Sequence, residues 1–257
     1  MIVKDQLERE LEFDSTPQRI VSLVPSQTEL LVDLGVGDRL VGVTKFCVHP
    51  KRLREKTTVV GGTKKVHLER IYALNPDLII CNKEENTAKM VEELEDIAPV
   101  WISDIKDIPD SIEMIRSLGG LIDLKESAMK LMDGICEEWR QFEQFMMNRP
   151  RRKVAYLIWK HPFMAAGKNT FIDALLRLNK FDNIIHEARY PEIRSENLLE
   201  AELVLLSTEP YPFKEEDVTE IRRRLNKDIK LVDGEYFSWY GSRLLKAFSY
   251  FRSLHQS

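Results

Sequence analysis

The chain of 257 residues is long enough for one large α/β domain or for two lobes of roughly 100–130 residues each. Hydrophobic residues make up 43% of it, with 11 glycines and 11 prolines, which excludes disordered, collagen-like and low-complexity classes. The 38 basic and 42 acidic residues give a formal charge of −4, so the charge balance offers no case for binding nucleic acid or an anionic membrane.

The N-terminal segment carries no secretory signal pattern, because Asp5, Glu8, Arg9 and Glu10 interrupt every apolar stretch in it. As written, the chain is not expected to be exported by that route. No apolar run approaches the about 20 residues that cross a bilayer, so we expect a soluble protein without membrane insertion.

Strand-like and helix-like segments alternate through the first half of the chain. Ser26 is a candidate N-cap with Glu29 three residues later, and Gly35 is expected to end that helix. Short buried runs separated by helices indicate a parallel sheet covered on both faces. The predicted strands are 19–23, 40–44, 77–81 and 100–103, and the predicted helices are 26–34, 67–74 and 87–97.

A long amphipathic helix is predicted from Ser127 to Met147, because its apolar residues keep one face for about six turns. At about 1.5 Å per residue it is about 30 Å long, roughly the width of a lobe. The strand–helix series stops before this helix and restarts after it. We therefore predict an N-terminal α/β lobe (1–122), a bridging helix (123–150) and a C-terminal α/β lobe (151–257).

The second half repeats the alternation of strands and helices. The predicted strands are 153–158, 183–185, 203–207 and 229–233, and the predicted helices are 170–178, 196–201, 217–225 and a terminal one from Ser242. The predicted fold is α/β, with two doubly wound lobes joined by one long bridging helix and a ligand cleft between the lobes.

Ligands of open parallel sheets bind beyond the carboxyl ends of the strands. The loops that follow the second-half strands are rich in aromatic residues, whereas the first-half loops are mainly polar. Flat aromatic walls suit a large, partly apolar ligand, and Trp159, Trp239 and Tyr240 are the preferred wall residues.

Signatures of catalysis and of metal binding are largely missing. There is no dinucleotide, P-loop, nucleophile-elbow or zinc-protease motif, and the five histidines are scattered. Cys47, Cys81 and Cys136 are widely spaced and are interpreted as free thiols. We predict neither catalytic residues nor a metal site, and the chain is interpreted as a non-enzyme.

Three sequence stretches resemble a known family: RIVSLVPSQTELLVDLGVGDRLVGVT, LERIYALNPDLII and DGEYFSWYGSRLL. Together with the bridging helix they are similar to the class III, helical-backbone substrate-binding proteins of ABC importers. That family includes receptors for vitamin B12, iron–siderophores and haem, and the second half is most similar to the cobalamin-binding branch. The resemblance covers about residues 18–245.

The resemblance implies a non-covalently bound cobalamin-like corrinoid, with no protein ligand to cobalt, delivered to an ABC permease dimer. It implies docking through one acidic residue on each lobe, which here are Glu69 and Glu196. We expect a monomer. The predicted ligand contacts are Trp159, Phe163, Trp239, Tyr240, Arg243, Lys45 and Glu84.

Two alternatives stay open. A ferric siderophore or haem could be the ligand, and anionic siderophores would be bound by basic residues such as Arg189, Arg243, Lys45 and Lys160. The chain could instead be a cytoplasmic corrinoid-handling protein or enzyme on a receptor fold, since fold does not fix function. The resemblance implies a periplasmic or cell-envelope location, which the missing signal pattern opposes, so the compartment is undecided.

Overall fold

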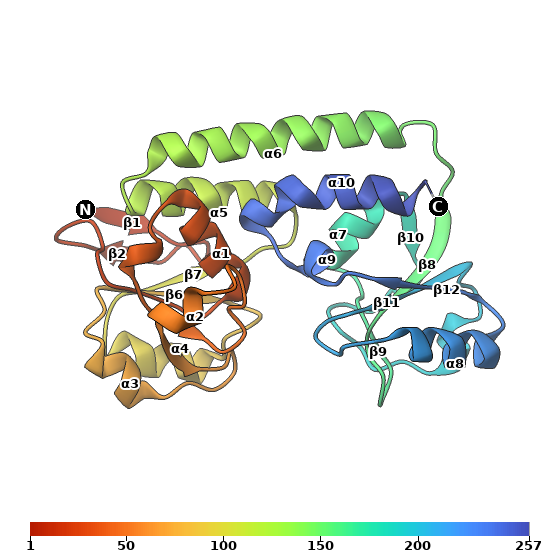
Figure 1. Ribbon diagram of the computed structural model, residues 1–257, viewed down its shortest axis with the longest axis horizontal. Helices are drawn as coiled ribbons and strands as arrows, with labels where there is room; N and C mark the ends of the chain where they lie inside the picture. Colours follow the sequence, from red (N-terminus) through yellow and green to blue (C-terminus); the bar gives the residue numbers. More distant parts are fainter. Residues whose placement is uncertain (257) are drawn as a thin grey trace. The chain divides into compact units, whose positions relative to one another are not determined.

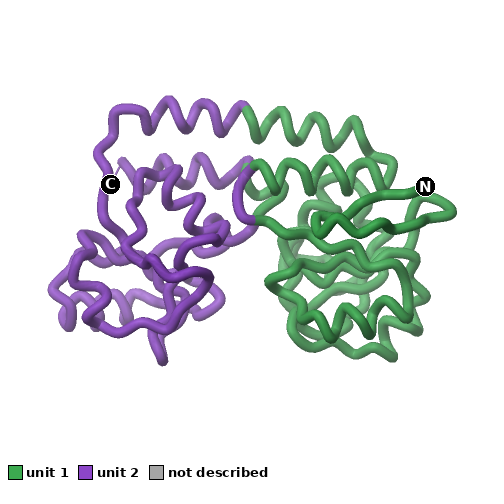
Figure 2. The backbone as a smooth tube through the Cα atoms, turned by 180° about the vertical axis from the view of Figure 1, so that it is seen from behind, with its two compact units in different colours: residues 1–105, 109–136, 240–244 green, residues 106–108, 137–239, 245–257 purple. Residues whose placement is uncertain are grey.

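The computed structural model describes residues 1–256 and divides into two compact units, coloured green and purple in Figure 2. Unit 1 consists of Met1–Ile105, Pro109–Cys136 and Tyr240–Leu244. Unit 2 consists of Lys106–Ile108, Glu137–Trp239 and the C-terminal segment from Leu245. The units are thus interleaved along the chain, which differs from the three consecutive segments predicted from the sequence.

The return of Tyr240–Leu244 to unit 1 has a local cause. The Gly241 amide donates a 2.9 Å hydrogen bond to Ser111 Oγ, and Arg243 forms two 2.8 Å hydrogen bonds with Glu29. Contacts so distant along the chain carry no signal in sequence periodicity.

Unit 1 is built on a five-stranded parallel sheet in the order β5-β4-β3-β6-β7. In Figure 1, α3 (Leu68–Ala73) and α4 (Ala88–Glu95) cover one face, and α5 (Ile108–Leu121) lies over the other. All five residues of the inner strand β6 are buried, as expected of a strand covered on both faces. The strands are β3 (Ile20–Ser22), β4 (Leu40–Thr44), β5 (Thr58–Gly61), β6 (Leu78–Asn82) and β7 (Val100–Ser103).

The remaining elements of unit 1 are short. They are the hairpin β1 (Ile2–Lys4) and β2 (Glu10–Glu12), the helices α1 (Pro25–Leu34) and α2 (Leu53–Lys56), and the 3₁₀ turn η1 (Gly37–Arg39). The hairpin is tied to the edge strand β7, because Arg9 binds both the buried Asp5 carboxylate and the Val100 carbonyl.

Unit 2 is built on four parallel strands in the order β10-β8-β11-β12, with β9 (Met164–Ala165) antiparallel to β8. The face that bears Leu157 and Leu206 packs on α8 through Val218 and Ile221. The other elements are β8 (Arg152–Trp159), α7 (Phe171–Leu178), β10 (Phe181–Asn183), η2 (Ser195–Leu198), β11 (Leu203–Ser207), α8 (Glu215–Leu225), β12 (Asp228–Val232), α9 (Glu235–Ser238), η3 (Gly241–Arg243, within unit 1) and α10 (Leu244–Leu254).

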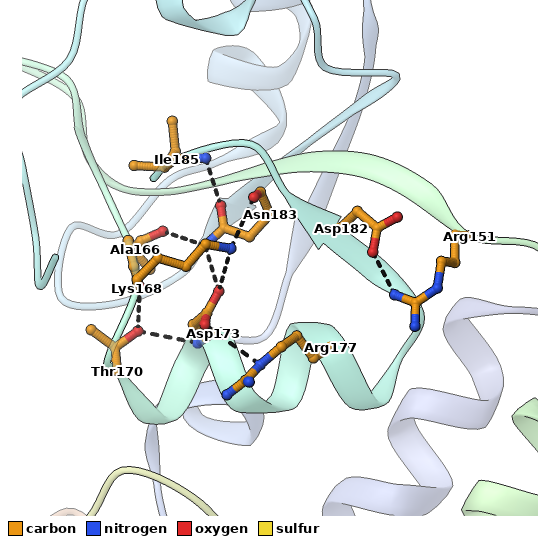
Figure 3. A network of polar contacts seen from close by, with 10 residues as sticks. Arg151, Ala166, Lys168, Thr170, Asp173, Arg177, Asp182, Asn183 and Ile185 are labelled. Atoms are coloured by element: carbon orange, nitrogen blue, oxygen red, sulfur yellow. Dashed lines mark hydrogen bonds and ion pairs between the residues drawn. The ribbon is translucent and has the colours of Figure 1, made fainter. Parts of the chain in front are cut away.

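A buried carboxylate fixes the start of α7 to the end of β10 (Figure 3). Asp173 accepts hydrogen bonds from Asn183 Nδ2 at 2.9 Å and from Lys168 Nζ at 3.3 Å. Thr170 caps the helix by accepting from the Asp173 amide. Because a buried charge is costly unless it is paired and hydrogen-bonded, this network specifies the local register of α7 against β10.

The long helix α6 (Lys125–Met146) takes part in both units, and the unit boundary lies between Cys136 and Glu137. In unit 1, α5 and α6 approach closely, because a Cβ on Gly119 would come within 2.3 Å of Ala128 Cβ. In unit 2, the Phe142 ring lies 5.9 Å from both Phe248 and Phe251 of α10. Because α6 packs on apolar residues in both units, its apolar face runs along the whole helix.

The predicted fold class is confirmed, and most predicted strands and helices lie within one or two residues of the observed bounds. The prediction of Ser26 as an N-cap is wrong: Val24 is the N-cap, and α1 begins at Pro25. Proline suits a first helical position because its missing N–H needs no partner there. Gly35 ends the helix as predicted, with a left-handed φ of 100°. The hairpin, β5 and α5 were not predicted.

Candidate functional site

The carboxyl edge of the unit 2 sheet presents aromatic side chains. Trp159, the last residue of β8, is 40% exposed, and its indole Nε1 donates to the His161 carbonyl at 3.2 Å. The Tyr211 ring meets it edge-on at 5.5 Å, and Phe213 lies 4.7 Å beyond Tyr211. Edge-to-face aromatic pairs are stable and orient both rings. The three rings together form a rigid apolar edge, called the aromatic edge below, that extends from the core to solvent.

A partly buried carboxylate follows the strand β11. Glu209 accepts hydrogen bonds from the Ser238 hydroxyl and the Trp239 indole, and its burial raises the pKa of its carboxyl group. Gly234 allows the two loops to meet, because a Cβ there would lie 2.3 Å from Ser207 Oγ. The network holds the loops after β11 and β12 together.

The basic side chain nearest to the aromatic edge is neutralised. Lys160 Nζ lies 2.7 Å from both Asp217 Oδ1 and Glu220 Oε2, and the hydrogen bond to Asp217 raises its pKa. Burial alone would raise the pKa of Asp217, but hydrogen bonds from Lys160 and the Lys214 amide lower it overall. The ammonium group of Lys160 is therefore bound by two carboxylates of α8.

The carboxyl edge of the unit 1 sheet is built from amides and hydroxyl groups. Gln27 Nε2 donates to Ser103 Oγ and, at 3.3 Å, to the Tyr240 hydroxyl. Asn82 Nδ2 also donates to Ser103 Oγ, at 3.0 Å. Burial raises the pKa of Tyr240, so its hydroxyl stays protonated. This edge is neutral and offers oriented polar groups rather than flat apolar walls.

The charged residues expected at the unit 1 edge lie near its rim. Lys45 is exposed, with Nζ 4.9 Å above the ring of Phe46, which is itself 47% exposed. Glu84 is half-buried, and its amide donates to Asn82 Oδ1 at 2.8 Å. Lys83 pairs with Asp104 at 2.7 Å.

Two of the predicted ligand contacts, Arg243 and Phe163, are buried in the structure. Arg243 is buried and forms a two-fold ion pair with the buried Glu29 inside unit 1, so its guanidinium is already neutralised. Phe163 is only 8% exposed and packs in the unit 2 core, with the Arg224 guanidinium 5.7 Å from its ring. Their roles as ligand contacts stay predictions.

Trp239 and Tyr240 are also mostly buried, with 7% and 6% of their surfaces exposed. Little of either ring is therefore in contact with solvent. Among the aromatic residues near the sheet edges, sequence analysis did not select the exposed Phe46 or the partly buried Tyr211. Both residues lie in loops that follow strands, a position that can be predicted from the sequence. The outward direction of their side chains could not be predicted.

The part of the chain that the structure describes offers no cluster of metal-ligating side chains. Within residues 1–256, no group of three or more His, Cys, Asp and Glu side chains is placed to hold a metal ion. Cys47 is buried against Thr28 and Thr44, and burial raises its thiol pKa, as expected of an unreactive thiol. No helix within residues 1–256 is long and apolar enough to cross a membrane.

Glu69 and Glu196 are both exposed, each in the first turn of a short helix, α3 in unit 1 and η2 in unit 2. Both helices directly precede a buried strand, β6 and β11 respectively. The two carboxylates thus hold equivalent positions in the strand–helix order of their units.

Comparison with known proteins gives one family and a consistent fold. Residues 20–220 match the family described as periplasmic binding protein. A vitamin B12-binding protein of Pectobacterium carotovorum is 26% identical over 237 residues, which cover 90% of this chain and 86% of that protein.

Two further proteins are similar to this chain, one in sequence and one in fold. An uncharacterized ABC transporter substrate-binding lipoprotein of Bacillus subtilis, YvrC, is 27% identical over 192 residues, covering 72% of this chain and 59% of that protein. A periplasmic heme-binding protein of Pseudomonas aeruginosa has a similar fold, with a TM-score of 0.82, 21% identity, and coverage of 94% of each chain.

Proposed function

The chain belongs to the periplasmic binding protein family, and we propose that it captures a cobalamin-like corrinoid for delivery to an ABC importer. Members of this family are solute-binding components of transport rather than enzymes, which confirms the prediction that the chain is not an enzyme.

The aromatic edge of unit 2 is the observation that supports a corrinoid most directly. A corrin is a wide, largely apolar ring, and the exposed Trp159 supported by Tyr211 offers a flat surface of the matching kind. Buried and partly buried aromatic residues also dominate binding energies at interfaces. The relative from Pectobacterium carotovorum is a vitamin B12-binding protein, which agrees with this ligand.

The neutral edge of unit 1 would complement such a ligand. The amide side chains of a corrinoid need hydrogen-bond donors and acceptors more than charges, and the network around Gln27 and Asn82 supplies neutral groups. Lys45 and Glu84 would contribute at the rim, as predicted from the sequence.

Haem is the second candidate, because His161 is exposed directly beside Trp159. An imidazole at that position would serve as an axial ligand to haem iron. The heme-binding protein of similar fold is in line with this alternative. A ferric siderophore is favoured less, because Arg243 and Lys160, two of the cations expected to bind it, are paired with carboxylates.

We also propose that Glu69 and Glu196 contact the permease. Both are exposed and occupy equivalent positions in their units. Replacing both by lysine should abolish corrinoid uptake in cells while leaving corrinoid binding by the purified protein unchanged. The matched control is replacement of Glu92 and Glu93, exposed carboxylates on α4, by lysine. Uptake that survives in the first variant would contradict this contact.

Equilibrium dialysis of the purified protein against cyanocobalamin, cobinamide, haem and ferrichrome tests the ligand. We expect saturable binding of cyanocobalamin or cobinamide at micromolar or lower concentration, with a red protein fraction. Binding of haem alone, lost in His161→Ala, would replace the corrinoid by the second candidate. Failure to bind either corrinoid would overturn the proposal.

A further inference from the structure

One four-residue pattern occurs in each unit, on the short helix that precedes an inner strand of the sheet. It is ERIY at residues 69–72, in α3 of unit 1, and ENLL at residues 196–199 of unit 2, where it begins in η2. A carboxylate comes first, and apolar side chains come third and fourth. The strands that follow hold the same place in their sheets, because β6 lies between β3 and β7 and β11 lies between β8 and β12. The two patterns are therefore topologically equivalent.

The third residue of each pattern fixes the helix to the core of its own unit. Ile71 has no exposed surface and packs in the core of unit 1, and Leu198, which is 1% exposed, packs in the core of unit 2. In a helical turn the first and fourth residues share one face, whereas the third points away from it. Burial of the third residue therefore turns the carboxylate and the fourth side chain together toward solvent.

The fourth residue of each pattern is a large apolar side chain that lies in solvent. Tyr72 is 73% exposed and Leu199 is 65% exposed, well above the 40% of Trp159 at the aromatic edge. Their main chains are held in place, because the Tyr72 carbonyl accepts from the Asn75 amide and the Leu199 carbonyl accepts from Lys227 Nζ. One exposed apolar side chain is ordinary on a protein surface. The same exposure at equivalent positions of two units calls for a common cause.

The carboxylates beside these apolar side chains are not neutralised. Within residues 1–256, neither Glu69 nor Glu196 forms a side-chain hydrogen bond or an ion pair. The neighbouring cations bind elsewhere, because Arg70 donates to a main-chain carbonyl and Arg224 donates to the Ser195 hydroxyl at 2.7 Å. An unpaired carboxylate next to an apolar side chain is complementary to a basic side chain set in an apolar surface.

The repetition of this surface indicates a partner that presents the complementary surface twice. A dimer of equal subunits does so by symmetry. A second copy of this chain fits less well, because two copies that met through these surfaces would bring carboxylates against carboxylates. The permease dimer that the family resemblance implies meets the requirement.

We propose that Tyr72 and Leu199 are the apolar anchors of the docking surface, each inserted into an apolar pocket of one permease subunit beside a basic side chain. This inference rests on the proposed contact of Glu69 and Glu196 with the permease and adds the residues that give that contact its affinity. Charged groups at an interface mainly set orientation and the rate of encounter, whereas a few desolvated apolar side chains carry much of the binding energy.

Cobinamide uptake by cells that depend on this protein tests the anchors. In the variant Tyr72→Ser/Leu199→Ser, uptake at limiting amounts of the protein should fall about tenfold, while cobinamide binding by the purified protein stays unchanged. The conservative variant Tyr72→Phe/Leu199→Met keeps the apolar surface and should retain uptake. The matched control is Met129→Ser/Met147→Ser, which removes one exposed apolar side chain from each unit, 53% and 64% exposed, and should also retain uptake.

The glutamate variant separates failure of this inference from failure of the permease contact. If Glu69→Lys/Glu196→Lys abolishes uptake but Tyr72→Ser/Leu199→Ser does not reduce it, the apolar anchors are overturned and the contact through the carboxylates stands. If uptake survives in the glutamate variant, the permease contact itself is wrong, and the anchors fall with it.

Photo-crosslinking in the same cells tests the contact without reference to the ligand. The full chain is produced with p-benzoylphenylalanine at position 72 or at position 199, and with the same amino acid at position 129 or 147 as the control. We expect both of the first two positions, and neither control position, to crosslink to the transmembrane subunit of an ABC importer, identified by mass spectrometry. Crosslinking of positions 72 and 199 to a second copy of this chain, or to no importer subunit, would overturn the proposal.

Discussion

The two parallel sheets of this protein carry different chemistry at equivalent edges. In unit 2, Trp159 and Tyr211 reach solvent from the carboxyl ends of the strands and form an apolar edge. In unit 1, Gln27, Asn82 and Ser103 occupy the corresponding place and bind one another. Both sheets are parallel with buried inner strands, so the difference arises from the residues at the carboxyl ends of the strands and in the segments that follow them.

This contrast shows how one architecture can be adapted to a large ligand. An aromatic surface contributes contact area without directional demands, whereas a fixed network of amides and hydroxyls orients polar groups. Two of the charged groups predicted to bind ligand, Arg243 and Lys160, are neutralised by carboxylates of their own units. The comparison therefore predicts which substitutions affect stability and which affect binding.

The largest expected effect is on the stability of unit 1. Arg243→Met leaves the Glu29 carboxylate buried without its ion-pair partner, and should lower the free energy of unfolding by about 3–5 kcal/mol. Urea denaturation followed by circular dichroism measures the change. The double variant Glu29→Leu/Arg243→Met should recover most of the loss. If the single variant keeps its full stability but binds ligand more weakly, Arg243 contacts the ligand instead.

A smaller effect, on binding alone, is expected at the edge of unit 2. Trp159→Ala should weaken corrinoid binding by about 1–3 kcal/mol, because the side chain is exposed and its loss removes a flat contact surface. Titration calorimetry with cobinamide measures it. Tyr72→Ala, which removes an exposed aromatic residue of α3, is the matched control and should bind normally. Equal weakening of corrinoid binding in both variants would contradict the assignment of binding to the aromatic edge.

The smallest effect is a pH dependence of stability at the Lys160–Asp217 pair. The folded pKa of Asp217 is lowered, so the pair stabilises the protein above the usual carboxyl pKa of about 3.9 and the gain is lost as the pH falls through the folded value. Wild type should exceed Asp217→Asn in stability by about 1 kcal/mol from pH 5 to 8, and the difference should shrink below pH 4. A difference that is constant down to pH 3 would show that hydrogen bonding rather than charge holds Lys160.

The sequence predicted the fold well where the pattern is local. The strands Leu40–Thr44, Val100–Ser103 and Leu203–Ser207 are found at their predicted bounds, because each is a short apolar run between turn residues. The helix α5 was missed, since the glycine pair Gly119-Gly120 lowers helix propensity. Gly119 is needed by a tertiary contact with Ala128, which no local pattern reveals.

The loops of the candidate site could be located from the sequence, but the direction in which their side chains point could not. Sequence analysis located the loops after the strands and identified Trp159, which is exposed as expected. It also selected Phe163 and Arg243, which the structure buries. Alternation of apolar and polar residues does not extend into loops, so whether a loop side chain turns to the core or to solvent depends on distant partners such as Glu29.

Hydrogen–deuterium exchange with and without saturating cobinamide tests most directly whether the ligand is bound at the aromatic edge. We predict protection of the main-chain amides in residues 159–163 and 209–213, with no change in residues 149–152 at the amino edge of the same sheet. Protection that spares both aromatic loops, in a protein shown to bind cobinamide, would contradict the account.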